Sequence, residues 1–255
     1  ENGPAVGGFN HKAMVINQAT IYNMDKKYTI AALIGVRGGS KRVKNKNSRN
    51  FSNSNLLSIK VKHMLDVPLI DKVIVNSEDE DLLSIAERAG AETVKRDPKF
   101  ASDEISTSDY YQNIAENCSA DIIVSVTATT PLIEKSSYVK GIEKFLELDG
   151  QGYDSVTSCS RVKEFLYMDG KPINYDPTNQ VRSQDLPEII SVNYGYSILF
   201  RIAMMRNRNI VGRNAFFVPL SKIESIDIDT PEDFYIAETL YNQAGKNSSL
   251  HNEIR

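Results

Sequence analysis

The sequence predicts an α/β fold: a Rossmann-like, mostly parallel sheet flanked by helices, with an inserted dimerisation or lid arm. Two observations support this prediction. Short continuous apolar runs alternate with amphipathic segments of helical length, which is typical of buried parallel strands joined by helices. Between about residues 163 and 190 this alternation stops, and the chain carries short polar pieces among Pro172, Pro177 and Pro187. We therefore expect this stretch to be the arm.

The chain of 255 residues divides into three predicted parts. Residues 1–27 read as a leader or linker, because Gly3-Pro4 and Gly7-Gly8 are turn dipeptides and no apolar period appears before Tyr28. Residues 28–245 form the domain, which is long enough to bury a sizeable core. Residues 246–255 form a tail.

The domain begins with a buried strand over Ile30–Ile34, followed by a loop rich in glycine and basic residues. The later apolar runs predict strands over Lys72–Val75, Ala91–Val94, Asp121–Val126, Ser155–Thr157, Ser191–Phe200 and Ser225–Ile228. The amphipathic segments predict helices over Asn55–Leu65, Glu78–Ala89, Asp109–Cys118, Lys135–Leu148 and Pro231–Asn242. We expect Gly90 to end the second helix, and the strand that follows it to lie at the edge of the sheet.

Composition excludes several function classes. The 30 Lys and Arg residues against 33 Asp and Glu give a net charge of −3, which argues against a dedicated nucleic-acid binder. No run approaches the length of about 18 apolar residues that a membrane span needs. Cys118 and Cys159 form no CxxC pair, so we expect a reducing, cytoplasmic location. The three scattered histidines predict neither a zinc site nor serine–histidine catalysis, which leaves carboxylates, basic side chains and backbone amides to carry the chemistry.

The loop after the first strand is the most informative segment. Parallel α/β sheets bind ligands at the carboxyl ends of their strands. Gly38 and Gly39 let backbone amides approach an anion, and Ser40 adds a hydroxyl donor. Neighbouring cations could neutralise a triphosphate, and they are Arg37, Lys41 and Lys46. The spacing fits neither a Walker A loop nor a dinucleotide fingerprint.

Two simpler interpretations of this loop remain open. It could be a solvated basic loop that binds nothing. It could also be a nuclear-import signal, built from Lys41, Arg42, Lys44 and Lys46. Its position directly after a buried strand, and not in a tail, favours phosphate binding.

Two carboxylates stand near the end of the domain. Asp227 and Asp229 occupy alternate positions at the end of the last predicted strand, so both side chains would lie on one face. Such a pair could hold Mg²⁺, which bridges nucleotide phosphates through one or two carboxylates and several waters. The alternative is a plain helix start, with Thr230 as the N-cap and Pro231 in the first turn. That start does not require Asp229.

Taken together, the chain resembles the acylneuraminate cytidylyltransferases, the CMP-sialic acid synthetases, over about residues 28–243. Each matching segment is weak alone, but all occur in the family's order and spacing. The segments are Arg37–Lys41 with Lys46-Asn47, Val75–Asp79, Arg96 with Ala101–Asp103 and Ser106–Ser108, Thr129–Leu132, and Ser225–Asp229.

The resemblance implies Mg²⁺-dependent transfer of CMP from CTP to the anomeric hydroxyl of a nonulosonic, sialic-acid-like sugar, with release of pyrophosphate. It also implies a homodimer whose arms cross to the partner. From the sequence itself we expect neither nucleic acid nor a membrane as a partner. Matching positions assign the triphosphate to Arg37, Lys41 and Lys46. They assign cytidine to Asn47, Arg96 and Thr107, and Mg²⁺ to Asp227 and Asp229, with Arg37, Lys41 and both aspartates expected to be catalytic.

The sugar side departs from the family pattern. The turn over Thr127–Ile133 lacks the family's usual glutamine and arginine. Arg182, Gln184 and Asn193 are the expected substrate-binding residues. The acceptor therefore stays open among N-acetylneuraminate, pseudaminic, legionaminic and related acids. A cytidylyltransferase for Kdo and a non-catalytic nucleotide-binding paralogue remain as alternatives.

Overall fold

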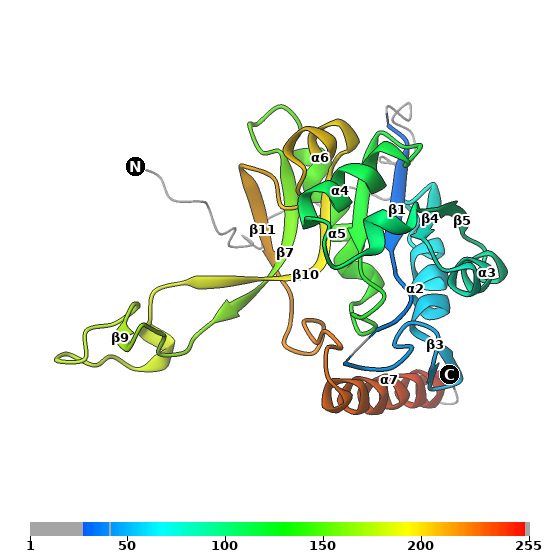
Figure 1. The fold of residues 1–255 in the computed structure, drawn as a ribbon. Coiled ribbons are helices and arrows are strands. Elements are labelled where there is room, and N and C mark those ends of the chain that lie inside the picture. The colour runs from blue at the N-terminus through cyan, green and yellow to red at the C-terminus, as the bar shows by residue number, and fades with distance from the viewer. Residues whose placement is uncertain (1–27, 41, 253–255) are drawn as a thin grey trace.

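A computed structural model describes residues 28–40 and 42–252 and contains a central seven-stranded sheet (Figure 1). The predicted leader and Lys41 lie outside the described residues. The strand order is β11-β7-β10-β6-β1-β4-β5. In that order the strands span Ala215–Pro219, Ser155–Val162, Ile189–Phe200, Ile122–Val126, Ile30–Gly35, Lys72–Ser77 and Glu92–Lys95. β10 is antiparallel to β6 and β7, and the other described neighbours are parallel, which confirms the mostly parallel sheet.

Helices cover both faces of this sheet (Figure 1). The helices that pack beside it are α2 (Leu56–Leu65), α3 (Glu80–Ala89), α4 (Thr107–Glu116), α5 (Lys135–Glu147) and α6 (Arg201–Asn207), and α7 (Pro231–Asn252) lies beyond one end of the strands (Figure 1). Along β1, Ala32 and Ile34 belong to one buried cluster, while Ala31 and Leu33 belong to the cluster on the other face. Burial on both faces explains why this strand reads as an unbroken apolar run.

Local signals fix several helix ends. Asn55 caps α2, and its side chain accepts a hydrogen bond of 2.8 Å from the Ser58 amide. Gly90 ends α3 in the left-handed conformation with φ of 103°, as predicted. α7 continues past the predicted end at Asn242 into the first part of the predicted tail. In the described residues, no helix is both long and apolar enough to cross a membrane.

The structure corrects one predicted strand. Ser225–Ile228 is a turn and an extended loop, because its backbone groups bond locally and to another loop. The Ile226 amide donates to the Ile223 carbonyl at 3.2 Å, and the Ile228 amide donates to the Thr129 carbonyl at 3.0 Å. The edge strand beside β7 is β11 instead, and both it and α6 were absent from the prediction.

The segment predicted as an arm projects from two strands of the sheet. β7 and β10 continue beyond the body as a two-stranded ladder, in which Val192 pairs with Cys159 and Ile189 with Val162. The arm then contains the short strands β8 (Tyr167–Met168) and β9 (Lys171–Pro172) and the 3-10 turn η2 (Ser183–Asp185). Figure 1 shows it projecting away from the rest of the chain.

Candidate active site

The loop after β1 needs glycine at two successive positions. Gly39 has a φ of +67°, a conformation that side chains other than glycine rarely adopt. At Gly38 an added Cβ would collide with the carboxylate of Asp79. The Asp79 side chain cannot easily move aside, because it caps α3. Its carboxylate accepts hydrogen bonds from the amides of Asp81 and Leu82 at 2.9 and 3.1 Å. The glycines thus let the loop lie close against the start of α3.

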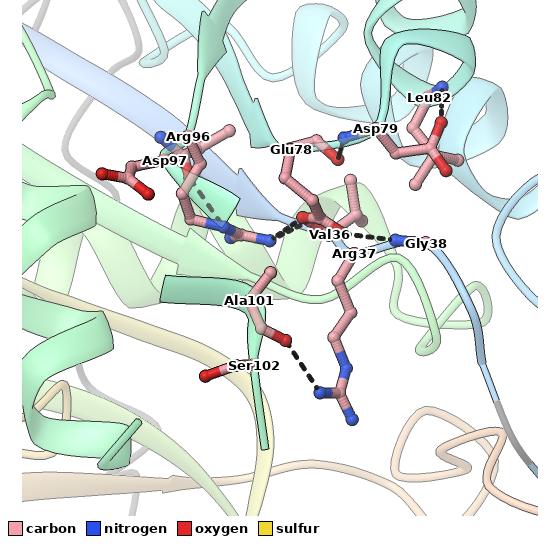
Figure 2. A network of polar contacts seen from close by, with 12 residues as sticks. Val36, Arg37, Gly38, Glu78, Asp79, Leu82, Arg96, Asp97, Ala101 and Ser102 are labelled. Carbon is pink, nitrogen blue, oxygen red and sulfur yellow. Dashed lines mark hydrogen bonds and ion pairs between the residues drawn. The ribbon is translucent and has the colours of Figure 1, made fainter. Parts of the chain in front are cut away.

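A buried ion pair, the Glu78–Arg96 brace, holds this loop in place (Figure 2). The Gly38 amide donates to Glu78 Oε1 at 2.8 Å, and Arg96 Nη2 donates to Glu78 Oε2 at 2.6 Å. The same nitrogen donates to the Val36 carbonyl at 2.6 Å, and Nη1 donates to Asn76 Oδ1 at 3.2 Å. The Arg96 side chain is only 1% exposed. One amide of the predicted anion loop is therefore already bound to a carboxylate of the chain itself.

Other predicted nucleotide-binding residues border the same loop. Arg37 Nη1 donates to the Ala101 carbonyl at 3.3 Å and to Asp103 Oδ1 at 2.8 Å, so it joins the loop to the segment predicted to hold cytidine. Thr107 is exposed at the first position of α4. Asn47 is buried, and its Oδ1 has no hydrogen-bond partner among the described residues.

The loop and the acidic segment meet although they are far apart in the sequence. Lys46 Nζ donates to the Ile228 carbonyl at 2.5 Å and lies 3.4 Å from Asp229 Oδ1. Arg42 Nη2 donates to the same Asp229 oxygen at 2.9 Å. Lys46 and Asp229, both among the predicted site residues, thus lie side by side. Arg42 is a further cation here, and sequence reasoning had placed it only in the alternative import signal.

Asp227 is partly enclosed beside this contact. Burial raises the pKa of its carboxyl, the neighbouring Asp229 adds to this effect, and Thr129 and Lys46 oppose it. Asp227 Oδ1 is buried and has no hydrogen-bond partner within the described part of the chain. The two aspartates do not share a strand face, because the segment is a loop; they come together through the loop's contacts.

Mg²⁺ fits the residues found here. A buried carboxylate oxygen without a donor, next to a second carboxylate, offers the hard oxygen ligands that this ion prefers. Over the described ranges, no three His, Cys, Asp or Glu side chains form a metal-binding group.

Thr230 also starts a helix, as the simpler interpretation of this segment predicted. The carboxylate that takes part in this helix start is that of Asp233, and not that of Asp227 or Asp229. Asp233 Oδ2 accepts from the Thr230 amide and hydroxyl, both at 2.8 Å, and the Asp233 amide donates back to Thr230 Oγ1 at 3.2 Å. Partial burial acts to raise the pKa of Asp233, but these hydrogen bonds outweigh it and lower that pKa. Asp233 therefore closes the first turn of α7.

The expected sugar-binding residues lie in two places. Asn193 uses its whole amide inside the chain: Oδ1 accepts from Ser158 Oγ at 2.6 Å, and Nδ2 lies 3.1 Å from Ser160 Oγ and 3.2 Å from Ser225 Oγ. It thereby ties β7 and β10 to the acidic segment. Arg182 and Gln184 are exposed in the arm, where Arg182 pairs with Asp185 at 2.8 Å. Because the arm projects away (Figure 1), one chain does not bring these two to the loop.

Sequence reasoning missed two charged residues at this edge. Glu78 could have been suspected from its place after β4, the parallel neighbour of β1. Lys60 is fully buried on α2, and this burial lowers the pKa of its ammonium to about 7, against the opposing influence of Asp227. Its signal was a lysine within the apolar stripe of a helix, between Leu57 and Met64.

The sequence is similar to known cytidylyltransferases. The sequence model of a family described as cytidylyltransferase matches residues 31–244. An N-acylneuraminate cytidylyltransferase of Oncorhynchus mykiss is 29% identical over 90% of this chain, which spans 53% of that protein. A pseudaminic acid cytidylyltransferase of Campylobacter jejuni is 27% identical over 82% of this chain and 94% of its own length.

The fold also matches a solved structure. A CMP:2-keto-3-deoxy-manno-octonic acid synthetase complexed with CTP superposes with a TM-score of 0.64 at 16% identity, covering 85% of this chain and 99% of the other. At that identity the likeness shows the fold alone. The family match covers most of the chain and includes both the loop and the acidic segment. The chain therefore belongs to the cytidylyltransferase family of nucleotidyltransferases.

Proposed function

We propose that this cytidylyltransferase transfers CMP from CTP to the anomeric hydroxyl of a nonulosonic sugar and releases pyrophosphate. One observation carries the proposal: Lys46 joins the phosphate loop to Ile228 and Asp229 at the carboxyl edge of the sheet. The acceptor class comes from the relatives, which are named for N-acylneuraminate and for pseudaminic acid.

The loop is the proposed nucleotide site. Arg37, Lys41 and Lys46, with the amides of Gly39 and Ser40, would bind the triphosphate. The unpartnered Oδ1 of Asn47 suits an amino or hydroxyl donor of cytidine. Thr107 would contact the nucleoside from the start of α4. For Arg96 the brace supports an indirect role, in which the guanidinium shapes the loop through Glu78.

Asp227 and Asp229 would hold Mg²⁺ against the phosphates. Bound there, the ion would neutralise charge on the transferring phosphoryl group. In the reaction a sugar oxygen bonds to the α-phosphorus, the bond from that phosphorus to the pyrophosphate oxygen breaks, and the hydroxyl proton is lost. Lys46 and Arg37 would stabilise the negative charge that grows on the departing pyrophosphate. Positioning and charge suffice for this step, so no covalent nucleophile is required.

A homodimer completes the proposal. The arm exposes large apolar side chains, with Tyr167 57%, Met168 63% and Ile173 51% exposed, which suits burial against a second copy. Crossing arms would carry Arg182 and Gln184 to the partner's site. A cytoplasmic location agrees with the two free, buried cysteines, Cys118 and Cys159.

Product formation tests the proposal directly. The purified chain is incubated with CTP, Mg²⁺ and a panel of N-acetylneuraminic, pseudaminic and legionaminic acids plus Kdo, and new CMP-sugar masses are sought. We expect a nonulosonic product that is lost in Asp229→Ala and kept in Glu80→Ala, whose exposed carboxylate lies outside the site. Product from Kdo alone would move the chain to the first alternative. CTP binding without product from any acceptor would favour the non-catalytic paralogue.

A further inference from the structure

Lys60 is a buried cation with no role in the chemistry described so far. It lies on α2 at 0% exposure. Its Nζ donates to the Thr130 carbonyl at 2.7 Å and to Tyr138 OH at 2.6 Å, and lies 3.5 Å from Thr130 Oγ1. An ammonium has three donors, so this environment satisfies it completely.

The partners of Lys60 lead to the acidic segment in two steps. Thr130 belongs to the turn that follows β6, at the carboxyl edge of the sheet. The preceding carbonyl, that of Thr129, accepts the Ile228 amide at 3.0 Å. The Ile228 carbonyl in turn accepts from Lys46 at 2.5 Å. Two hydrogen bonds, connected by the backbone between Thr129 and Thr130, thus link Lys60 to Ile228, the residue between the two carboxylates.

Stability alone does not account for a lysine at this position. Removing an ammonium from water costs several kcal/mol, which hydrogen bonds to neutral groups offset only in part. An apolar side chain of similar length would fill the space between Tyr138 and the turn without that cost. What it could not do is hold the Thr130 carbonyl, because it has no donor.

We propose that Lys60 is a positioning residue, which fixes the turn over Thr129–Pro131 and through it the placement of Asp227 and Asp229 against the phosphate loop. Its kinetic consequence rests on the proposed function, whereas its structural consequence does not. The ammonium touches no reacting group. It acts through the backbone of the turn and the Ile228 amide.

Hydrogen exchange of Lys60→Met in the 255-residue chain gives the structural test. The Ile228 amide is protected by its bond to Thr129, so loosening the turn exposes it to exchange. We expect peptides covering residues 224–230 to exchange about tenfold faster in Lys60→Met than in the parent chain. Met204→Ala is the matched control, because Met204 is equally buried but belongs to the cluster on the other face of the sheet. It should lose stability without this local change.

Kinetics and a milder variant complete the test. In Lys60→Met we expect the Mg²⁺ concentration for half-maximal rate to rise about tenfold, with CTP affinity in the absence of metal nearly unchanged. Tyr138→Phe removes one partner of Lys60 and should shift both readouts in the same direction by less. If Lys60→Met fails to fold, the exchange of Tyr138→Phe decides. Parent-like exchange around Ile228 in a folded variant overturns the proposal. An inactive parent chain with faster exchange in Lys60→Met would overturn the proposed function only.

Discussion

Removing the carboxylate of the Glu78–Arg96 brace should be among the most destabilising single changes at the loop. The two side chains are 18% and 1% exposed and lie 2.6 Å apart, so Glu78→Ala would leave a buried guanidinium without its charge partner. Breaking such a pair costs about 3–5 kcal/mol, and the partial exposure of Glu78 places the expected loss near about 3 kcal/mol. Glu78→Gln keeps an acceptor for the Gly38 amide, so we expect it to lose about half as much.

Urea unfolding followed by circular dichroism measures these losses. Glu80→Ala is the control, since Glu80 pairs with Lys95 where both side chains are more than half exposed, and such pairs contribute about 0–1 kcal/mol. In addition, Glu78→Ala should raise the KM for CTP, because the Gly38 amide loses the bond that fixes the loop. Equal losses in the free energy of unfolding for Glu78→Ala and Glu80→Ala would refute the idea that the Glu78–Arg96 brace stabilises the fold more than an exposed ion pair does.

Three further outcomes follow from the same coordinates. Phe51→Ala should lower the free energy of unfolding in urea by about 3–5 kcal/mol, because the Phe51 ring is fully buried. Tyr235→Ala should lower it by under about 0.5 kcal/mol, because the Tyr235 side chain is 72% exposed. Similar losses in the two variants would contradict the different burial of the two rings. Gly39 and Gly150 both have a left-handed backbone with open space around the Cα atom, so Gly39→Ala and Gly150→Ala should each lose about 1 kcal/mol of stability. The KM for CTP should rise only in Gly39→Ala. An unchanged KM in that variant would contradict the assignment of the loop to nucleotide binding. The pKa of Lys60 is about 7 when folded and 10.5 as a free group, so the unfolded chain binds more protons between these values and stability should rise with pH in that window, by up to about 5 kcal/mol. Lys60→Met should lack this rise, and parallel pH profiles for the two proteins would disprove it.

Local sequence signals predicted most of the sheet and its helices. β1 and β6 are continuous apolar runs because both of their faces are buried, and α3 has an acidic cap and a terminal glycine that mark its ends. The place of the anion loop, directly after β1, followed from one rule about parallel sheets. These features depend on neighbours in sequence or on topology, so one sequence was enough.

The failures share a different physical origin. Ser225–Ile228 alternates like a strand, and β11 is an equally short apolar piece; which of them joins the sheet depends on a free edge beside β7, not on local pattern. Lys60 and Glu78 are buried charges whose partners lie far along the chain, at Thr130 and at Gly38 and Arg96. Neither composition nor hydrophobic periodicity indicates which residues distant in the sequence will form such contacts.

The ladder at the base of the arm has a mechanical consequence. Backbone hydrogen bonds between β7 and β10 run from the sheet into the arm, past the register shift between Val192 and Ser197. The arm is therefore fixed at its base, and bending it back toward the phosphate loop would require breaking main-chain hydrogen bonds, not only sliding side chains past one another. A force on the outer end of the arm would act on β7 and β10, the two strands that Asn193 links to the acidic segment by hydrogen bonds. The arm therefore behaves as a stiff extension of the sheet that reaches outward from the rest of the chain (Figure 1).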